Sequence, residues 1–349
     1  MPVKTAGELR ALLTVPPDCP SLVDYLKCFD LPLMVLQEAY AITRVVFEVA
    51  EDAAQDGVKY IEIRFSPVLH TRHHLSLSRV MEAVCEGQVM AELNLPITVR
   101  IIVCGMRQMD PTVSKKLAEI AWRYRNRGVV AFDLAGPEHG YSSEIHRDAF
   151  DIIRSNCLNC TLHSGEAAGW EYVRDAVRYC GAQRIGHGVQ LEQNAQLLQF
   201  FVDKGIPVEV CLTSNTQTKA VASLHKHPLR RYFDLGMVVV LCTDNPTVSG
   251  TTLTNEYHTA QELFGFTPVE LVIMIDNGFR SAFLPMTMKS RLRAEALATC
   301  VRLLNDAGFD VGSAIIEKTA RLGPALQFPA HVLSNVGKVS PTGRKLSLR

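Results

Sequence analysis

Four side chains have the types and the placement that a metal-assisted reaction needs. His163, Glu166, His187 and Asp244 each lie at or just past the end of a short apolar run. Imidazole nitrogens and carboxylate oxygens are standard ligands of divalent ions such as zinc. Glu166 follows His163 closely, past a glycine, and a carboxylate beside a metal site can move protons. Each residue alone would be an ordinary helix cap or a buried hydrogen-bonding group, but the four together favour a catalytic site.

Short apolar runs alternate with amphipathic segments along most of the chain. This alternation is typical of βαβ units and a parallel sheet. Several glycines, such as Gly57, Gly128 and Gly205, fall between a helical pattern and the next strand, where a left-handed residue can end a helix. The predicted strands are 60–65, 97–104, 129–135, 161–163, 184–188, 207–211 and 238–243. The predicted helices are 36–56, 77–92, 110–125, 142–155, 170–180, 192–204, 226–235, 254–263, 268–283 and 288–307.

The polar residues decide between a closed barrel and an open doubly wound sheet. Six of the predicted strands end in chemically capable side chains, and barrels collect functional groups from the ends of many strands. An open sheet concentrates them at one crevice, and neither G-x-G-x-x-G nor G-x-x-x-x-G-K-[ST] occurs. We therefore expect an α/β fold of the (β/α)₈ TIM-barrel kind. One barrel domain should cover 1–323, and 324–349 should form a loosely structured tail.

Composition excludes several classes of protein. The 349 residues carry 36 Lys plus Arg and 36 Asp plus Glu, so the formal net charge is zero. A neutral chain has no overall electrostatic attraction for nucleic acid or for an anionic membrane. No apolar run could span a bilayer, and the N-terminus lacks the apolar core of a signal peptide. The ten cysteines are too sparse for a disulfide scaffold. These features predict a reduced, cytoplasmic protein that binds a small molecule, with a homo-oligomer left open.

Six stretches resemble, in order, the motifs of the zinc-dependent adenosine and AMP deaminase family. The stretches are 60–67 (YIEIRFSP), 133–136 (DLAG), 161–168 (TLHSGEAA), 184–188 (RIGHG), 211–215 (CLTSN) and 243–246 (TDNP). The resemblance covers roughly residues 8–310 and implies a (β/α)₈ barrel of the metal-dependent hydrolase kind. It also implies one zinc ion and hydrolytic deamination of a purine nucleoside.

The resemblance assigns a role to each matching residue. His163 and Asp244 would ligate the metal, and Asp244 would also hold the attacking water. Glu166 would donate a proton to purine N1, and His187 would orient the attacking oxygen and stabilise charge at C6. The backbone N–H of Gly136 would meet N3. Asn245 stands where many relatives have Asp, and its amide can donate to N7 without a shifted pKa.

The family's first strand, with its H-x-H ligand pair, has no counterpart here, because the chain opens on 5–13 (TAGELRALL), which resembles the family's segment after that strand. We therefore expect the barrel without its first strand, with sheet edges at 60–65 and 238–243. His225 and His227 form an H-x-H, but His227 is interpreted as a helix-start residue. His70, His73 and His74 are expected to be exposed or at a pocket mouth. Incidental positions are expected for the pair Cys157 and Cys160, and salt-bridge roles for Arg64 and Arg107.

The sequence is compatible with three functions. The first is deamination of adenosine and 2′-deoxyadenosine to the inosine nucleosides. The second is the same chemistry on another 6-aminopurine, such as adenine or an aminofutalosine, because the ribose-facing acid of the family is not matched. The third is an inactive, metal-deficient, purine-binding remnant, because two metal-ligand histidines are not matched.

Overall fold

Seven parallel strands form one sheet in which the spatial order follows the chain order. The structure is a computed structural model that describes residues 5–309. Each strand pairs in parallel with the strand before it, and no pairing within the described range joins the last strand to the first. The strands are β1 (Tyr60–Phe65), β2 (Thr98–Met106), β3 (Val129–Ala135), β4 (Asn159–Ser164), β5 (Arg184–His187), β6 (Val208–Val210) and β7 (Val239–Leu241).

Side-chain contacts across the sheet show how strongly it is curled. Arg64 on β1 lies 3.4 Å from Asp133 on β3 and 2.5 Å from Glu209 on β6. Arg184 on β5 pairs with Glu209 at 2.6 Å and also with Glu62 on β1. In a flat sheet β1 and β6 would lie roughly 24 Å apart, at about 4.8 Å per strand. The sheet is therefore bent into an open barrel, as the sequence predicts, with a buried ionic layer inside it.

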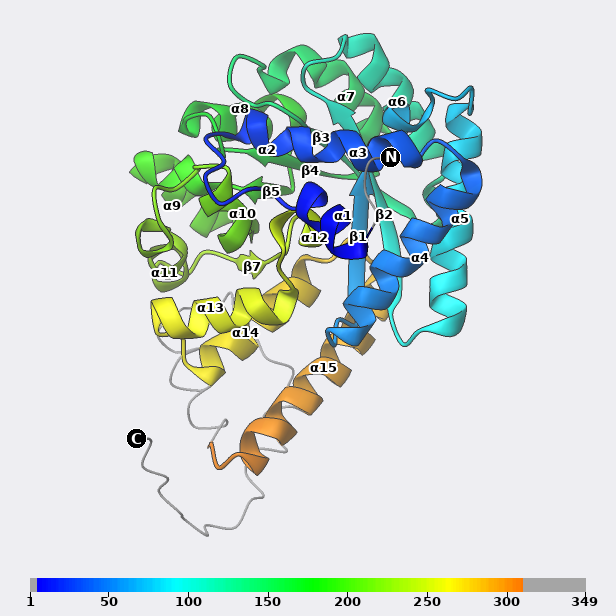
Figure 1. Ribbon diagram of the computed structural model, residues 1–349. Coiled ribbons are helices and arrows are strands. Elements are labelled where there is room, and N and C mark those ends of the chain that lie inside the picture. Colours follow the sequence, from blue (N-terminus) through cyan, green and yellow to red (C-terminus); the bar gives the residue numbers. More distant parts are fainter. Residues whose placement is uncertain (1–4, 310–349) are drawn as a thin grey trace.

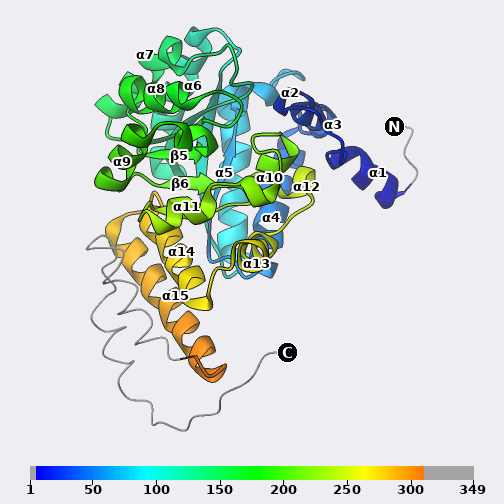
Figure 2. The ribbon, with the colours of Figure 1, turned by 90° about the vertical axis from the view of Figure 1, so that its left-hand side faces the viewer.

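Helices cover the outside of the sheet, and three short helices lie across one end. In Figure 2, α1, α2 and α3 stand on the same side of the molecule as α10 and α12, which follow β6 and β7. This side therefore carries the C-terminal ends of the strands (Figure 1). The α-helices are α1 (Ala6–Leu13), α2 (Leu22–Leu26), α3 (Asp30–Val35), α4 (Ala39–Gln55), α5 (Leu77–Asn94), α6 (Pro111–Arg123), α7 (Arg147–Ser155), α8 (Trp170–Cys180), α9 (Ala195–Lys204), α10 (Leu212–Gln217), α11 (Leu229–Asp234), α12 (Pro246–Ser249), α13 (Leu253–Phe264), α14 (Pro268–Ser281) and α15 (Met286–Asp306). The 3₁₀ helices are η1 (Lys27–Phe29), η2 (Pro67–His70), η3 (Arg125–Arg127), η4 (Ser143–His146), η5 (Val189–Gln193) and η6 (Leu224–Lys226).

The predicted elements agree closely with these bounds. Every predicted strand is present, and the two outer strands of the sheet are the two expected edges. The edge at β7 is partly covered, because Asn277 on α14 donates to the carbonyl of Val239 at 3.1 Å. The helices α1, α2, α3, α10 and α12 were not predicted, since elements this short show little periodicity. The proposed boundary between 323 and 324 lies outside the described residues.

A small second apolar cluster attaches the N-terminal helices to the end of the barrel. It consists of Val15, Cys19, Leu22 and Tyr25, packed with Val248 on α12. The main core lies between the sheet and its outer helices. Among the described residues, no helix is long and apolar enough to cross a membrane.

The ionic layer inside the barrel predicts a specific loss of stability in acid. Burial raises the pKa of Glu209, but Arg64 and Arg184 outweigh burial and lower it to about 2. A depressed carboxyl pKa stabilises the fold above the unfolded pKa, and this stabilisation is lost as the pH falls toward the folded pKa. We expect Glu209→Gln to cost about 3 kcal/mol at pH 7, because it leaves buried guanidinium charge without its partner.

Denaturant unfolding of both proteins between pH 7 and pH 3 measures this effect. The difference between wild type and Glu209→Gln should shrink below about pH 4.5, as the wild-type carboxylate begins to lose its advantage. The exposed Glu119 on α6 provides the control, and Glu119→Gln should change the stability by less than about 0.5 kcal/mol. A difference that stays constant down to pH 3 would contradict the assignment.

Candidate active site

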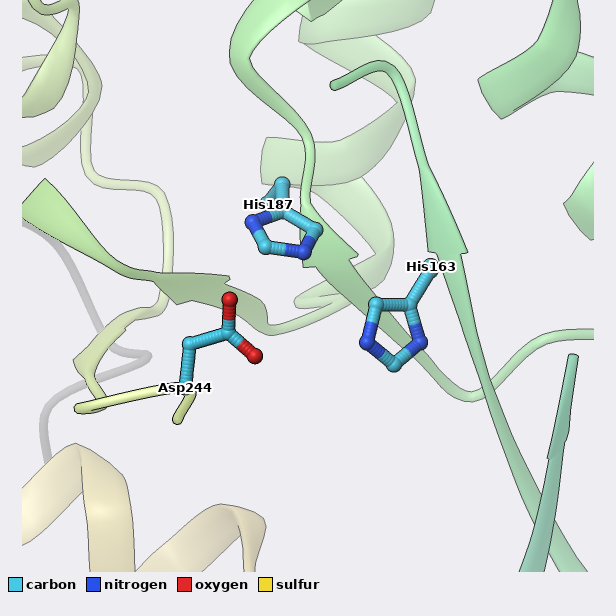
Figure 3. A group of neighbouring side chains, drawn as sticks. All are labelled: His163, His187 and Asp244. Atoms are coloured by element: carbon cyan, nitrogen blue, oxygen red, sulfur yellow. The ribbon is translucent and has the colours of Figure 1, made fainter. Parts of the chain in front are cut away.

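Three potential metal ligands meet where β4, β5 and β7 end. His163 is the penultimate residue of β4, His187 is the last residue of β5, and Asp244 follows β7. One ligand atom from each lies within 4.8 Å of the ligand atoms of the other two (Figure 3). Parallel strands bring their C-terminal ends to the same edge, so residues far apart in sequence converge. The structure therefore brings these predicted residues together.

His163 is held in the orientation of a metal ligand. Its Nδ1 lies 2.7 Å from Oδ2 of Asp133, and its backbone N–H donates to Oδ1 of the same carboxylate at 3.2 Å. The other ring nitrogen faces Asp244 (Figure 3). A carboxylate behind a histidine is the usual outer partner of a metal-ligating imidazole. Burial opposes a charged ring, but Asp133 outweighs burial and raises the pKa of His163.

Asp244 is oriented by two donors, one on each oxygen. The hydroxyl of Ser214 donates to Oδ2 at 2.6 Å, and Nδ2 of Asn245 donates to Oδ1 at 2.7 Å. Asp244 and His187 both have positive φ, 58° and 65°, which non-glycine residues rarely adopt. Strained backbone of this kind gathers at functional sites, where the surrounding structure holds it.

Glu166 lies beside this group as a buried carboxyl group. Its Oε2 is 3.5 Å from Nε2 of His187, and the residue is 6% exposed. Its Oε1 is buried and has no hydrogen-bond partner in the described part of the chain. Burial raises the pKa of Glu166, with His187 opposing the shift. A carboxyl group with a raised pKa and an unengaged oxygen is suited to proton donation.

The carboxylate of Glu138 holds the loop that carries Glu166. Its two oxygens accept five hydrogen bonds, from the hydroxyl of Ser164 (3.1 Å) and from the backbone N–H groups of Gly165 (2.6 Å), Glu166 (3.0 Å), Ala167 (2.8 Å) and Ala168 (3.0 Å). Glu138 is 3% exposed and comes from the connection after β3. It therefore ties the β4 loop to the β3 loop directly behind the candidate proton donor.

The donor set fits a metal ion. Zinc takes imidazole nitrogens and carboxylate oxygens as ligands. His163 and Asp244 supply one of each in a fixed orientation, and the ligand atoms of His163, Asp244 and His187 lie within 4.8 Å of one another.

Comparison with known proteins decides the family. A family model described as adenosine deaminase matches residues 1–299. A Dictyostelium discoideum protein named probable adenosine deaminase is 50% identical over 318 residues, which cover 91% of this chain and 41% of that protein. The chain belongs to the adenosine deaminase family.

Other members of the adenosine deaminase family match over most of their own length. An adenosine deaminase from Clostridium acetobutylicum is 36% identical over 84% of this chain and 87% of the relative. The crystal structure of an adenine deaminase from Arthrobacter aurescens superposes with a TM-score of 0.78 at 22% identity, over 85% of this chain and 89% of that chain. This structural likeness confirms the fold class. The chain spans less than half the length of the Dictyostelium protein.

Two residues expected to contact a purine stand at the same end of the deaminase barrel. Gly136 follows β3 with a φ of 102°, and a Cβ added there would lie 2.5 Å from Oε1 of Gln108. Asn245 uses its Nδ2 for Asp244 and, at 3.3 Å, for the hydroxyl of Tyr25 on α2. The contacts of Gly136 and Asn245 with a purine stay predictions.

The other histidines lie away from the ligand group, and His70 is buried rather than exposed. His70 is buried against Phe65, and its Nδ1 lies 2.8 Å from the carbonyl of Leu36, so it is not exposed, while its alternative place at a pocket mouth stays a prediction. The 3₁₀ turn after β1 buries this ring instead of leaving it in an open loop. His73 and His74 are exposed, as expected.

The remaining candidates have structural roles. Cys157 is exposed and Cys160 is buried, so they form no paired site. Arg64 forms the expected salt bridges, whereas the buried Arg107 donates to the backbone carbonyls of Tyr141 and His163. Arg107 therefore supports the backbone of a candidate ligand rather than a carboxylate.

Nothing in the sequence indicated the role of Glu138, and the hydrogen bond between Asn215 and His227 was not predicted. Glu138 follows Gly136 in a polar stretch, and nothing in its spacing shows that it accepts hydrogen bonds from another loop. His227, interpreted as a helix-start residue, is buried and hydrogen-bonded to Asn215.

Proposed function

We propose that this chain catalyses hydrolytic deamination of adenosine and 2′-deoxyadenosine, releasing ammonia and the inosine nucleoside. The observation that carries the proposal is the position of Glu166, a buried acid with an unengaged oxygen beside His163, His187 and Asp244. Hydrolytic deamination of a 6-aminopurine needs a proton on the ring and a nucleophile at C6. Glu166 can supply the proton, and the group of His163, His187 and Asp244 can hold the nucleophile.

His163 and Asp244 would hold a zinc ion, consistent with the zinc-dependent family that the motifs resemble. Zinc, when bound, supplies a water of lowered pKa as the nucleophile. Glu166 donates its proton to purine N1, which makes C6 a better electrophile. His187 donates a hydrogen bond to the oxygen that attacks C6. As the C6–O bond forms and the C6–N6 bond breaks, one proton of the attacking water leaves with the amino group as ammonia, and the other restores the acid form of Glu166. The backbone N–H of Gly136 would orient the ring through N3. The amide of Asn245 would orient it through N7, in exchange for its 3.3 Å hydrogen bond to the hydroxyl of Tyr25.

Adenosine is the proposed substrate because the relatives matched over most of their length are adenosine deaminases. Deamination of adenine or of an aminofutalosine by the same residues is the second candidate. A metal-deficient purine-binding remnant is the third candidate. We further propose a cytoplasmic location and no nucleic-acid or membrane partner, supported by the balanced charge.

Zinc content and turnover of the 349-residue chain test the proposal together. We expect about one tightly bound zinc per chain, measured by atomic spectrometry, and conversion of adenosine to inosine that outpaces any conversion of adenine. Removing the metal with a chelator should abolish turnover, and added zinc should restore it. Turnover that survives complete removal of the metal would sink the metal-assisted mechanism.

An Asp244→Asn variant tests the ligand assignment without relying on turnover. The amide keeps the size of the side chain but loses the charge that attracts a divalent ion, so bound zinc should fall at least about tenfold at equal free zinc. Asp306→Asn, at an exposed position at the end of α15, is the matched control and should keep the wild-type zinc content. Equal zinc in both variants would remove Asp244 from the ligand set.

A further inference from the structure

A buried chain of hydrogen bonds runs from a backbone amide to the ring of His187. The N–H of Leu229 lies 3.1 Å from Nδ1 of His227. Nε2 of His227 lies 3.1 Å from Oδ1 of Asn215, and Nδ2 of Asn215 lies 2.9 Å from Nδ1 of His187. Asn215, on α10, is fully buried, and the two histidines are 5% and 3% exposed.

The direction of this chain is set at its first step. A backbone N–H can only donate, so Nδ1 of His227 must accept, and the hydrogen of that ring is on Nε2. Nε2–H then donates to Oδ1 of Asn215, which fixes the orientation of the amide. The amide N–H of Asn215 therefore donates to Nδ1 of His187, and the hydrogen of the neutral His187 ring is on Nε2.

The surroundings of His227 support the same direction. The ring packs edge-on against Phe264, with centroids 6.3 Å apart. Burial lowers the pKa of His227 to about 3, with the nearby His187 adding to the shift, so the ring stays neutral. A neutral ring has one donor and one acceptor, as the chain of bonds requires.

We propose that Asn215 and His227 are positioning residues that hold His187 in the Nε2–H tautomer, as a hydrogen-bond donor to the reacting oxygen and not a metal ligand. The inference rests on the proposed function for its kinetic consequence, but not for the tautomer itself. It also separates the three clustered residues by role. The Nε2 atom that points toward Glu166 carries a hydrogen, so only His163 and Asp244 offer a lone pair or a charge to the metal.

Nuclear magnetic resonance of the full chain with ¹⁵N-labelled histidine tests the tautomer directly. Two-bond ¹⁵N–¹H correlations of the zinc-loaded protein should show His187 with a bare Nδ1 and a protonated Nε2, assigned by comparison with a His187→Asn spectrum. In Asn215→Asp a carboxylate faces Nδ1, so the signal should shift toward the tautomer with hydrogen on Nδ1. A wild-type spectrum with hydrogen on Nδ1 of His187 would overturn the proposal, whether or not the protein turns over adenosine.

A matched pair of variants at position 227 tests the kinetic consequence. In His227→Gln the side-chain amide nitrogen can replace Nε2 and still donate to Asn215, whereas His227→Asn keeps only the acceptor for Leu229. Each loses one hydrogen bond, so their stabilities should be similar. We expect kcat to fall at least about tenfold in His227→Asn and to stay within about threefold of wild type in His227→Gln, with KM changed little in both.

The two arms distinguish failure of the inference from failure of the proposed function. Equal losses of kcat in both position-227 variants would show a merely structural role and overturn the inference. The Nε2–H tautomer in a zinc-loaded chain that does not deaminate adenosine would contradict the proposed function and leave the positioning role supported.

Discussion

Replacing Glu166 with glutamine is expected to lower kcat for adenosine by about 10³-fold and to leave KM nearly unchanged. Proton transfer by a positioned side chain contributes roughly 10²–10⁴-fold to a rate. Glutamine fills the same buried space and can donate a hydrogen bond to N1, but it cannot transfer the proton. Binding should therefore survive while the chemical step fails.

Steady-state kinetics with adenosine over a range of concentrations measures this separation. The control is Glu119→Gln at an exposed position on α6, which should keep the wild-type kcat and KM. Zinc content should be equal in all three proteins, because Glu166 is not among the clustered ligands. A Glu166→Gln enzyme with more than about a tenth of wild-type kcat would refute the proton-donor role.

Replacing Glu138 with glutamine should both destabilise the protein and disable the site. Four backbone N–H groups and one hydroxyl share its two carboxylate oxygens. In the variant an NH₂ group must face N–H donors on one side, so buried donors lose their acceptor. Each unsatisfied buried donor costs about 1–3 kcal/mol, and the lost charge weakens the remaining bonds. We expect a loss of about 3–5 kcal/mol in unfolding free energy.

The loop of Glu166 should lose its position even where the variant still folds. At low temperature, where Glu138→Gln remains folded, we expect kcat/KM to fall by at least about 10²-fold, because a small misplacement of a catalytic group is costly. Denaturant unfolding and kinetics on the same samples measure both effects. Glu144→Gln, in the same connection but exposed, should match wild type in both assays. Wild-type stability and activity in Glu138→Gln would contradict the role of Glu138 in holding the loop of Glu166.

The βα alternation of this chain is visible in its sequence because strand burial and helix amphipathicity are local patterns. All seven strands follow from apolar runs with turn signals at their ends, and α8 (Trp170–Cys180) matches its prediction residue for residue. The helices α1 to α3 escape the same reasoning, because their contacts are tertiary. The buried hydroxyl of Tyr25, for example, is hydrogen-bonded to Ser249 and Asn245, which lie more than 200 residues away in sequence.

The residues of the candidate site also fall into two groups, those that the sequence predicts and those that only the structure reveals. His163, Glu166, His187 and Asp244 are recognisable in the sequence, since strand ends of a parallel barrel share one edge and their side-chain types suit metal chemistry. Which groups hold them in place is invisible there. Glu138 and Asn215 act through hydrogen bonds between loops of different βα units, and no spacing within one unit encodes such a contact. His227 bonds Asn215 within the segment between β6 and β7, but only the folded loop brings the two side chains together.

The sequence by itself determined the order of the strands and of the longer helices, the chemical groups at the strand ends and the family. Only the tertiary structure decided how those groups are oriented. The reason is that hydrogen-bond direction depends on which donor meets which acceptor in space. A single backbone N–H at Leu229 can therefore set the tautomer of a histidine that belongs to a different βα unit.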